Sequence, residues 1–252
     1  IMSSINIAQL LPALDSGGVE KGVVDLSNYL SRKSIKNHII SSGGKLEKYL
    51  NNKFTYHHKL KVNSKNFLLF PFVSHEINNL INKYKINILH TRSRGPAWMV
   101  NLIRNKSFKT VSTFHNVYNG TSFIKKNYNK GLAKMDYIVA NSNFVKNEII
   151  TKYNLQNKHI NVIPRGIDTN FFDPTIKNKE IDNLKQKLEF DKNKKIILFP
   201  GRITAWKGQK EFLNVVKKFR NDNYLFYFVG SITNKSYDKN LKREIHKYNL
   251  NK

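Results

Sequence analysis

The sequence predicts an α/β protein with two doubly wound domains, each a parallel sheet with helices on its faces. Three observations lead to this fold class. Short apolar runs alternate with amphipathic segments along the chain. The order strand, loop, helix, strand occurs near both ends, which is typical of parallel sheets. A polar segment containing Pro174 interrupts the alternation, so we expect domains at residues 1–170 and 171–252.

The first domain begins with a buried strand at residues 5–11 and a loop containing Gly17 and Gly18. A helix follows, because Val19, Val23, Leu26 and Leu30 form one apolar stripe. Further strands are predicted at 38–41, 87–90, 109–115, 136–141 and 161–164, with helices between them. Two helix starts are also predicted, with Pro96 at the first helical position and Ser142 as the N-cap.

The second domain begins with a helix at 181–188 and a strand at 196–199, which ends in Pro200 and Gly201. The next helix carries an apolar stripe, and a second strand covers 224–229. The predicted stripe consists of Phe212, Val215, Val216 and Phe219. A last helix begins near Tyr237 and is predicted to continue to the end of the chain. Two strands are too few to bury both faces of a doubly wound sheet. Since the chain also begins Ile1-Met2, we expect a fragment with an incomplete second domain.

The composition supports globular domains and restricts the classes of partner. The chain has 252 residues, 40% of them hydrophobic, and a formal charge of +27 from 44 basic and 17 acidic residues. Such a charge usually indicates an anionic partner. However, Lys is dispersed together with Asn and Ile, which a coding bias explains, and no nucleic-acid-binding module is recognisable. Nucleic acid is therefore not expected as the partner.

Other classes are excluded by absences in the sequence. There is no cysteine, which excludes disulfides and thiolate chemistry. The longest apolar run, residues 67–73, is far shorter than the roughly 20 residues that span a bilayer. The first residues show no signal-peptide pattern. We expect a cytoplasmic protein, either free or peripheral on the inner membrane.

Arg202 and Lys207 follow the strand at 196–199 and precede a helix. In a βαβ unit this loop lies at the carboxyl edge of the sheet, where α/β proteins bind ligands. Two cations near a helix N-terminus favour an anion, best a diphosphate. The alternative, a solvated basic loop, is about equally supported by the spacing alone.

Five motifs occur in an order that identifies a family. They are GGVE at 17–20, FHN at 114–116, VANSNFVKNEI at 139–149, VIPRGID at 162–168 and GRITAWKG at 201–208. The chain resembles the GT-B retaining glycosyltransferases of family 4. This resemblance implies two Rossmann-like domains facing a cleft, with a nucleotide-sugar bound mainly to the second domain.

The resemblance also implies roles for several residues. Arg202 and Lys207 correspond to the cations on the donor diphosphate, next to Gly201. Gly17 and Gly18 correspond to the loop that closes over the phosphates, and His115 to the histidine that contacts the donor sugar. From the residues alone, the paired glycines could equally form a tight turn and the histidine could be structural. Arg165 and Asp168 are placed in the interdomain linker, and the family more often has Asn at position 165.

Two further groups are assigned to the acceptor and the membrane. His90, Arg92 and Arg94 crowd a strand end and would meet an anionic acceptor, with a solvated loop as the alternative. A basic aromatic patch would contact anionic lipid headgroups, with an ordinary Lys-rich surface as the alternative. The residues of that patch are Lys125, Lys126, Tyr128 and Lys130.

The leading hypothesis is a retaining glycosyltransferase that moves a sugar from a UDP- or GDP-linked donor to a cell-envelope glycan or lipid, as in lipopolysaccharide synthesis. No metal or other cofactor is expected, because the chain has no Asp-x-Asp pair and Arg202 and Lys207 would neutralise the diphosphate. The family's glutamate pair, seven residues apart, is not reached by this chain, so we expect the fragment to be inactive. The alternatives are a non-catalytic nucleotide-sugar or polyanion binder of the same fold and a basic nucleic-acid-binding protein.

Overall fold

The computed structural model describes residues 5–104, 107–118, 120, 122–175, 179–188, 190–191, 193–219 and 223–250. The chain separates into two compact units, Ile1–Ile167 and Asp168–Lys252, and each is considered by itself. Residues 1–2 and 251–252, on which the expectation of a fragment partly rested, lie outside the described residues.

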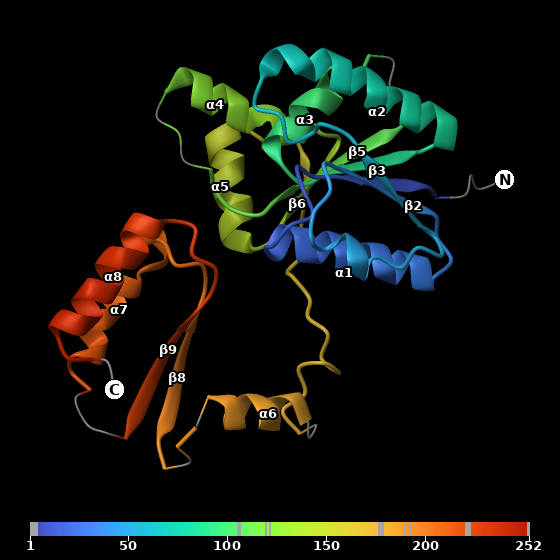
Figure 1. The fold of residues 1–252 in the computed structure, drawn as a ribbon. Helices are drawn as coiled ribbons and strands as arrows, with labels where there is room; N and C mark the ends of the chain where they lie inside the picture. Colours follow the sequence, from blue (N-terminus) through green and yellow to red (C-terminus); the bar gives the residue numbers. More distant parts are fainter. Residues whose placement is uncertain are drawn as a thin grey trace. The chain divides into compact units, whose positions relative to one another are not determined.

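The first unit is built on a seven-stranded sheet in which every neighbouring pair is parallel (Figure 1). The strand order is β3-β2-β1-β4-β5-β6-β7. The strands are β1 Ile7–Leu10, β2 Asn37–Ser41, β3 Thr55–Lys59, β4 Ile88–Thr91, β5 Lys109–Phe114, β6 Tyr137–Ala140 and β7 His159–Val162.

Helices connect these strands and cover the sheet. Figure 1 shows α1 on one side of the sheet and α2 and α3 on the other. The helices of this unit are α1 Gly18–Arg32, η1 Glu47–Tyr49, η2 Phe67–Leu69, α2 Phe70–Tyr84, α3 Arg94–Asn101, α4 Phe123–Asn129, η3 Lys130–Lys134 and α5 Asn143–Tyr153.

The core of the first unit has two apolar clusters, one on each side of the sheet. The smaller cluster joins Val23 and Val24 of α1 to Ile39 of β2. The larger one joins the other helices to the central strands, with Phe114 and Ile77 fully buried. Burial on both faces explains the apolar run of β6, whereas β5 also buries the small polar residues Thr110, Ser112 and Thr113.

The strand order creates a switch point between β1 and β4. From β1 the chain proceeds through α1 to β2 on one side, whereas from β4 it proceeds through α3 to β5 on the other. The carboxyl ends of β1 and β4 are therefore adjacent while their loops diverge. In doubly wound folds this is where ligands bind.

The second unit has a two-stranded parallel sheet with helices packed on it. Ile203, Leu213, Tyr237 and Leu241 form its buried cluster. The elements are α6 Lys179–Lys187, β8 Lys195–Pro200, η4 Ala205–Lys207, α7 Gln209–Val216, β9 Tyr224–Val229 and α8 Lys235–Lys247. Since α8 ends at Lys247, the prediction of a helix continuing to the chain end is wrong.

Three local predictions for helices and strands of the first unit need correction. The edge strand β3 was not predicted, and β7 begins two residues before the predicted range 161–164. Pro96 is the third residue of α3 and not the first, because the helix begins after the extended Ser93. Pro is still tolerated there because the N–H groups of a first turn have no partner within the helix. Ser142 is the N-cap of α5, as predicted, and accepts a hydrogen bond from the Val145 N–H.

The apolar stripe predicted for α7 is only partly correct. Val216 is buried, but Val215 and Phe219 are exposed, and Leu213, which was not included, is the most buried apolar residue of the helix. Phe212 instead packs its ring against those of Phe199 and Phe228 on the sheet.

Candidate functional site

Arg92 places a cation at the switch point of the first unit. Its backbone N–H donates to the Leu10 carbonyl (2.8 Å), which fixes it beside the end of β1. Its Nη2 donates to Gln9 Oε1 (2.5 Å), and Gln9 Nε2 donates in turn to Ser27 Oγ of α1 (2.8 Å). Burial, followed by the charge of Arg165, lowers the pKa of Arg92 to about 10, so the guanidinium stays charged at neutral pH.

Arg165 and His115 form the second part of the cluster. Arg165 Nη1 donates a hydrogen bond to the Gly18 carbonyl, and Arg165 Nη2 lies 2.8 Å from His115 Nδ1. Because a guanidinium only donates, Nδ1 must be the acceptor and the neutral imidazole carries its proton on Nε2. Burial first, and then the charges of Arg165 and Arg92, lower the pKa of His115 to about 3.

His90 is held in a neutral state next to these groups. Its Nε2 lies 2.7 Å from Thr113 Oγ1 on β5. Burial, then the charge of Arg92 and the neighbouring His115, set the pKa of His90 well below its ordinary value. The cluster thus combines two guanidiniums with two neutral imidazoles.

The charges in this cluster are not neutralised within the protein. Among the described residues, no ion pair joins Arg92 or Arg165 to a carboxylate. Two buried nitrogens, Arg92 Nε and His115 Nε2, also lack a hydrogen-bond partner in that part of the chain. Buried donors without partners are costly. The arrangement therefore suits an anionic ligand that also carries hydroxyl groups.

The loop before α1 brings Gly17 and Gly18 to the same cluster. Gly17 has a φ of 153°, a conformation that side chains disfavour. The neighbouring loop braces it, because Leu14 N–H donates to the Gly43 carbonyl and Leu46 N–H to the Leu14 carbonyl. A Cβ on Gly44 would come within 2.4 Å of the Leu14 carbonyl carbon, so only glycine fits this contact.

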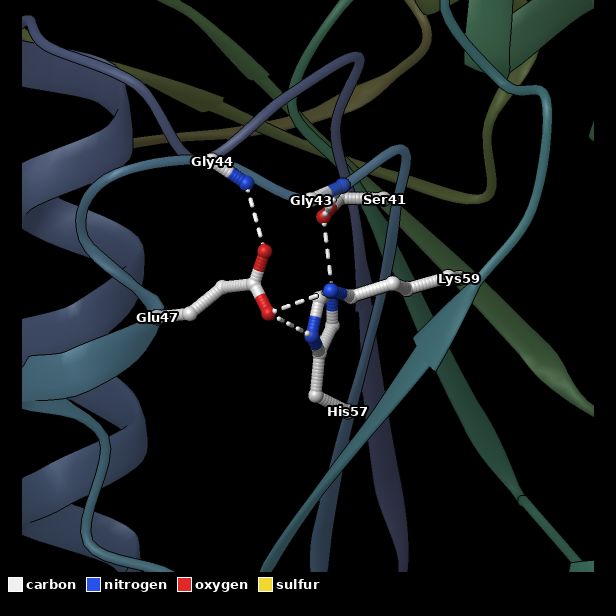
Figure 2. A network of polar contacts seen from close by, with 6 residues as sticks. All are labelled: Ser41, Gly43, Gly44, Glu47, His57 and Lys59. Carbon is white, nitrogen blue, oxygen red and sulfur yellow. Dashed lines mark hydrogen bonds and ion pairs between the residues drawn. The ribbon is translucent and has the colours of Figure 1, made fainter.

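A polar network holds the bracing loop in place (Figure 2). The Glu47 carboxylate accepts from the Gly44 N–H (2.6 Å) and pairs with Lys59 (2.9 Å) and His57 Nδ1 (3.4 Å). His57 Nε2 lies 2.8 Å from Ser41 Oγ, which also accepts from the Gly43 N–H. Ser41 is fully buried, so this serine is a structural group and not an accessible nucleophile.

Arg94 does not join the group in which it was predicted. Its Nη1 donates to Asn129 Oδ1 (2.6 Å), and its guanidinium lies 4.3 Å from the centre of the Tyr118 ring and 5.3 Å from that of Tyr128. The side chain therefore anchors α4 to α3. His90 and Arg92 are together at the end of β4, as predicted.

In the second unit, Arg202 and Lys207 lie on either side of Trp206 in the sequence and both contact its ring. Lys207 Nζ is 4.3 Å and the Arg202 guanidinium 5.6 Å from the ring centre. All three side chains are exposed. Neither cation has a carboxylate partner within the described ranges. Both charges remain available to an anion at the carboxyl end of β8.

Buried contacts fix the backbone of this loop. Gln209 is fully buried, and its Nε2 donates to the Arg202 carbonyl (2.9 Å). The Gly201 N–H donates to the Val229 carbonyl (2.8 Å), which ties the loop to β9. The position of the Arg202 backbone is thus set by packing, while its side chain is free to meet a ligand.

Two residues of these sites were not assigned a role from the sequence. Gln9 is a polar residue inside an apolar strand, and that contrast was the available signal. Arg165 was assigned to the linker together with Asp168. Asp168 does cap a turn, accepting from the N–H groups of Asn170 and Phe171, but Arg165 belongs to the first unit.

The described residues contain neither a candidate metal site nor a helix that could span a membrane. Within them, no group of three potential ligands from His, Asp and Glu could hold a metal ion. No helix among the same residues has the length and apolarity needed to cross a membrane.

Comparisons with known families match nearly the whole chain. The family described as Glycosyltransferase Family 4 matches residues 16–171, and the one described as Glycosyl transferases group 1 matches residues 180–252. No curated protein matches the chain.

Solved structures of glycosyltransferases are similar in fold. A glycosyltransferase from Rickettsia africae ESF-5 has 34% sequence identity and a TM-score of 0.84, over 98% of this chain and 66% of that one. Anabaena Alr3699/HepE, in complex with UDP and glucose, has 16% identity and a TM-score of 0.78, over 98% and 67%. WaaG, a glycosyltransferase involved in lipopolysaccharide biosynthesis, has 11% identity and a TM-score of 0.72, over 96% and 68%. The chain spans about two thirds of the length of these structures, and the predicted GT-B fold class is confirmed.

Proposed function

The chain belongs to glycosyltransferase family 4, and from this premise we propose that the protein transfers a sugar, with retention, from a UDP- or GDP-linked donor to a cell-envelope glycan or lipid. The observation that carries the proposal is the pair of unneutralised cations, Arg202 and Lys207, at the carboxyl end of β8. The similar Anabaena protein binds UDP and glucose, which supports a nucleotide-sugar as the donor.

The chemistry assigned to Arg202 and Lys207 is stabilisation of the leaving group. When the bond between the sugar carbon and the diphosphate oxygen breaks, its electron pair remains on that oxygen. Cations that are already in position stabilise this developing charge most in the transition state. The sequence has no Asp-x-Asp pair, so we assign to these two side chains the neutralisation that a metal ion provides elsewhere.

The first unit supplies groups suited to the sugar and the acceptor. His115 Nε2 carries a proton and has no partner in the described residues, so it would donate to a hydroxyl of the donor sugar. Arg165 acts as a positioning residue, because it fixes the tautomer of His115 and contacts the Gly18 carbonyl. We assign Arg92, next to His90, to an anionic group of the acceptor. Sugar transfer at the cytoplasmic side of the inner membrane would suit a lipid-linked acceptor.

The test uses the protein encoded by the complete reading frame. UDP- and GDP-sugars are screened for transfer and hydrolysis, and the best donor is then used with Arg202→Ala and Lys207→Ala. We expect each substitution to lower kcat about 100-fold or more, the usual effect of removing one group that stabilises transition-state charge. Lys218→Ala is the matched control, because Lys218 is exposed beyond the far end of α7.

Unchanged turnover in both variants would overturn the assignment of the two cations. Binding of a nucleotide-sugar without transfer or hydrolysis of any donor tested would instead identify a non-catalytic binder of the same fold. For the 252-residue chain alone we expect no turnover, which the same assay measures.

A further inference from the structure

Gln9 is a fully buried polar residue in the apolar strand β1. The sheet pairs it with His90 of β4, and the Arg92 N–H extends this pairing to the Leu10 carbonyl. Side chains two residues apart on a strand point to the same face of a sheet. Arg92 therefore lies diagonally across from Gln9 on that face, and this register explains how the two side chains meet.

The contacts of the Gln9 amide determine which of its ends faces Arg92. A guanidinium only donates hydrogen bonds, and a backbone carbonyl only accepts them. The amide oxygen therefore accepts from Arg92 Nη2 (2.5 Å), while the amide nitrogen donates to the Val23 carbonyl (3.3 Å) and to Ser27 Oγ (2.8 Å). Helix α1 thus orients the amide, and the amide orients Arg92. We call Ser27, Gln9 and Arg92 the amide link.

The amide link holds a largely buried cation without neutralising it. Arginine is seldom buried unless it is paired, and its usual partner is a carboxylate. Among the described residues, which include Asp15 and Glu20 at the start of α1, no acidic side chain forms an ion pair with Arg92. The Gln9 oxygen carries only a partial negative charge. The full positive charge of Arg92 therefore remains available to a ligand.

We propose that Gln9 is a positioning residue for the acceptor, which holds the Arg92 guanidinium in place and, being uncharged, leaves its positive charge to an anionic group of that acceptor. Arg92 Nε has no partner in the described part of the chain, so the guanidinium also keeps hydrogen-bonding capacity. A carboxylate at position 9 would form an internal ion pair with Arg92 and close the site to anions.

The role of Gln9 rests on the proposed function, because the contact of Arg92 with the acceptor is part of it. Two requirements distinguish this role from a purely structural one. A structural residue at position 9 needs only to keep Arg92 in place. A positioning residue for an anion site must do so without a negative charge, and a carboxamide meets both requirements.

The first experiment measures anion binding by the protein encoded by the complete reading frame, with no donor present. Inorganic phosphate is the probe, NMR follows the arginine side chains, and Arg92→Lys identifies the signal of Arg92. This signal should shift as phosphate is added to the unchanged protein. Gln9→Glu keeps an acceptor for Arg92 but adds a negative charge beside it. Its affinity for phosphate should be lower by about tenfold or more.

The matched control is Gln156→Glu, which adds the same charge at an exposed position before β7. It should bind phosphate like the unchanged protein. Ser27→Ala removes the hydroxyl that orients the amide and adds no charge. It should weaken phosphate binding about threefold, from the loss of one neutral hydrogen bond. This variant tests the amide link even if a thermal melt shows that Gln9→Glu does not fold.

Gln9→Met separates position from charge, because it removes the hydrogen bond to Arg92 and adds no charge. Its loss of phosphate affinity should be smaller than that of Gln9→Glu. Equal losses in these two variants would overturn the requirement for a neutral residue. The positioning role would be overturned if Gln9→Glu or Ser27→Ala bound phosphate like the unchanged protein, or if phosphate did not shift the Arg92 signal at all.

Kinetics distinguish a failure of this role from a failure of the proposed function. With an identified acceptor, Gln9→Glu should raise the KM for the acceptor with little change in the KM for the donor, and Gln156→Glu should change neither. A lower kcat with an unchanged KM for the acceptor would overturn the assignment to the acceptor. If the protein transfers no sugar while Gln9→Glu still loses phosphate affinity, the proposed function fails and the anion site held by Gln9 stands.

Discussion

At the scale of single residues, the contact of Arg165 with His115 decides which nitrogen of the imidazole can donate. Arg165 occupies Nδ1 as a donor, so the proton is on Nε2. The same guanidinium lowers the pKa of His115, in addition to the larger effect of burial. His115 is therefore a permanent neutral donor in the physiological pH range and not a general base.

Arg165→Met should raise the pKa of His115 from about 3, because one of the two neighbouring positive charges is lost while the burial remains. It should also allow both tautomers to form. A histidine-selective NMR titration measures both effects. Arg104→Met is the control, since Arg104 is an exposed cation elsewhere in the same unit. If the titration of His115 is the same in both variants, Arg165 does not position it.

The sequence located most of these residues but not their relationships. His115 and Gly18 were assigned to the donor site by the family resemblance, and Arg92 was assigned to the acceptor because it lies at the end of a predicted strand. The role of Arg165 was missed because its contact with Gly18 spans 147 residues of sequence. A local pattern contains no information about such a contact.

At the scale of elements, the Glu47 network supports the loop that carries Gly17. Hydrogen bonds from Lys59 and the Gly44 N–H lower the pKa of the Glu47 carboxyl. The stabilisation it provides is therefore present above the ordinary pKa of a glutamate and is lost as the pH falls through the lowered value. At neutral pH the network is complete.

Glu47→Gln should loosen this loop at neutral pH. The Gly44 amide should exchange with solvent faster, by about tenfold if one charged hydrogen bond is lost. The pKa of His57, which burial already lowers, should fall further, because the Glu47 charge favours its protonated form. Amide exchange measured by NMR tests the first expectation, and a histidine-selective NMR titration tests the second. Asp25→Asn is the control, since Asp25 forms only a surface pair with Lys21. Unchanged exchange at Gly44 would contradict the supporting role.

The predictability of an element depended on its burial. The central strands β5 and β6 were predicted nearly to the residue, because β6 is an apolar run and the β-branched Thr110, Val111 and Thr113 of β5 favour a strand. The edge strand β3, with the sequence TYHHK, pairs only with β2 and has no apolar run to find. The stripe of α7 was misjudged because Leu213 and not Val215 faces the core, a rotation of the helix that the helical spacing alone does not fix.

At the scale of the whole first unit, burial keeps several histidines neutral. Five of them, His38, His57, His58, His90 and His115, have pKa values below the ordinary value of 6.5, with burial as the largest cause in each. The values for His38 and His115 are about 4 and about 3. The unfolded chain therefore binds more protons than the folded unit as the pH falls below about 7.

We expect the free energy of unfolding to decrease as the pH falls from 7 towards 4, the interval between the ordinary and the lowered pKa values. Each histidine that protonates only on unfolding adds a slope of up to about 1.4 kcal/mol per pH unit. Thermal melts followed by circular dichroism at pH 8, 7, 6 and 5 measure this decrease. A melting temperature that stays constant from pH 7 to pH 5 would show that the histidines titrate normally in the folded unit.

The position of β1 in the middle of the sheet has a consequence for how the chain acquires its structure during synthesis. β1 leaves the ribosome well before one of its two partners, because β4 pairs Ile88 with Ile7, 81 residues later. Contacts of such long range slow folding. During translation β1 and β2 therefore keep apolar surface uncovered until β4 emerges, and in this interval a molecular chaperone would protect them from aggregation.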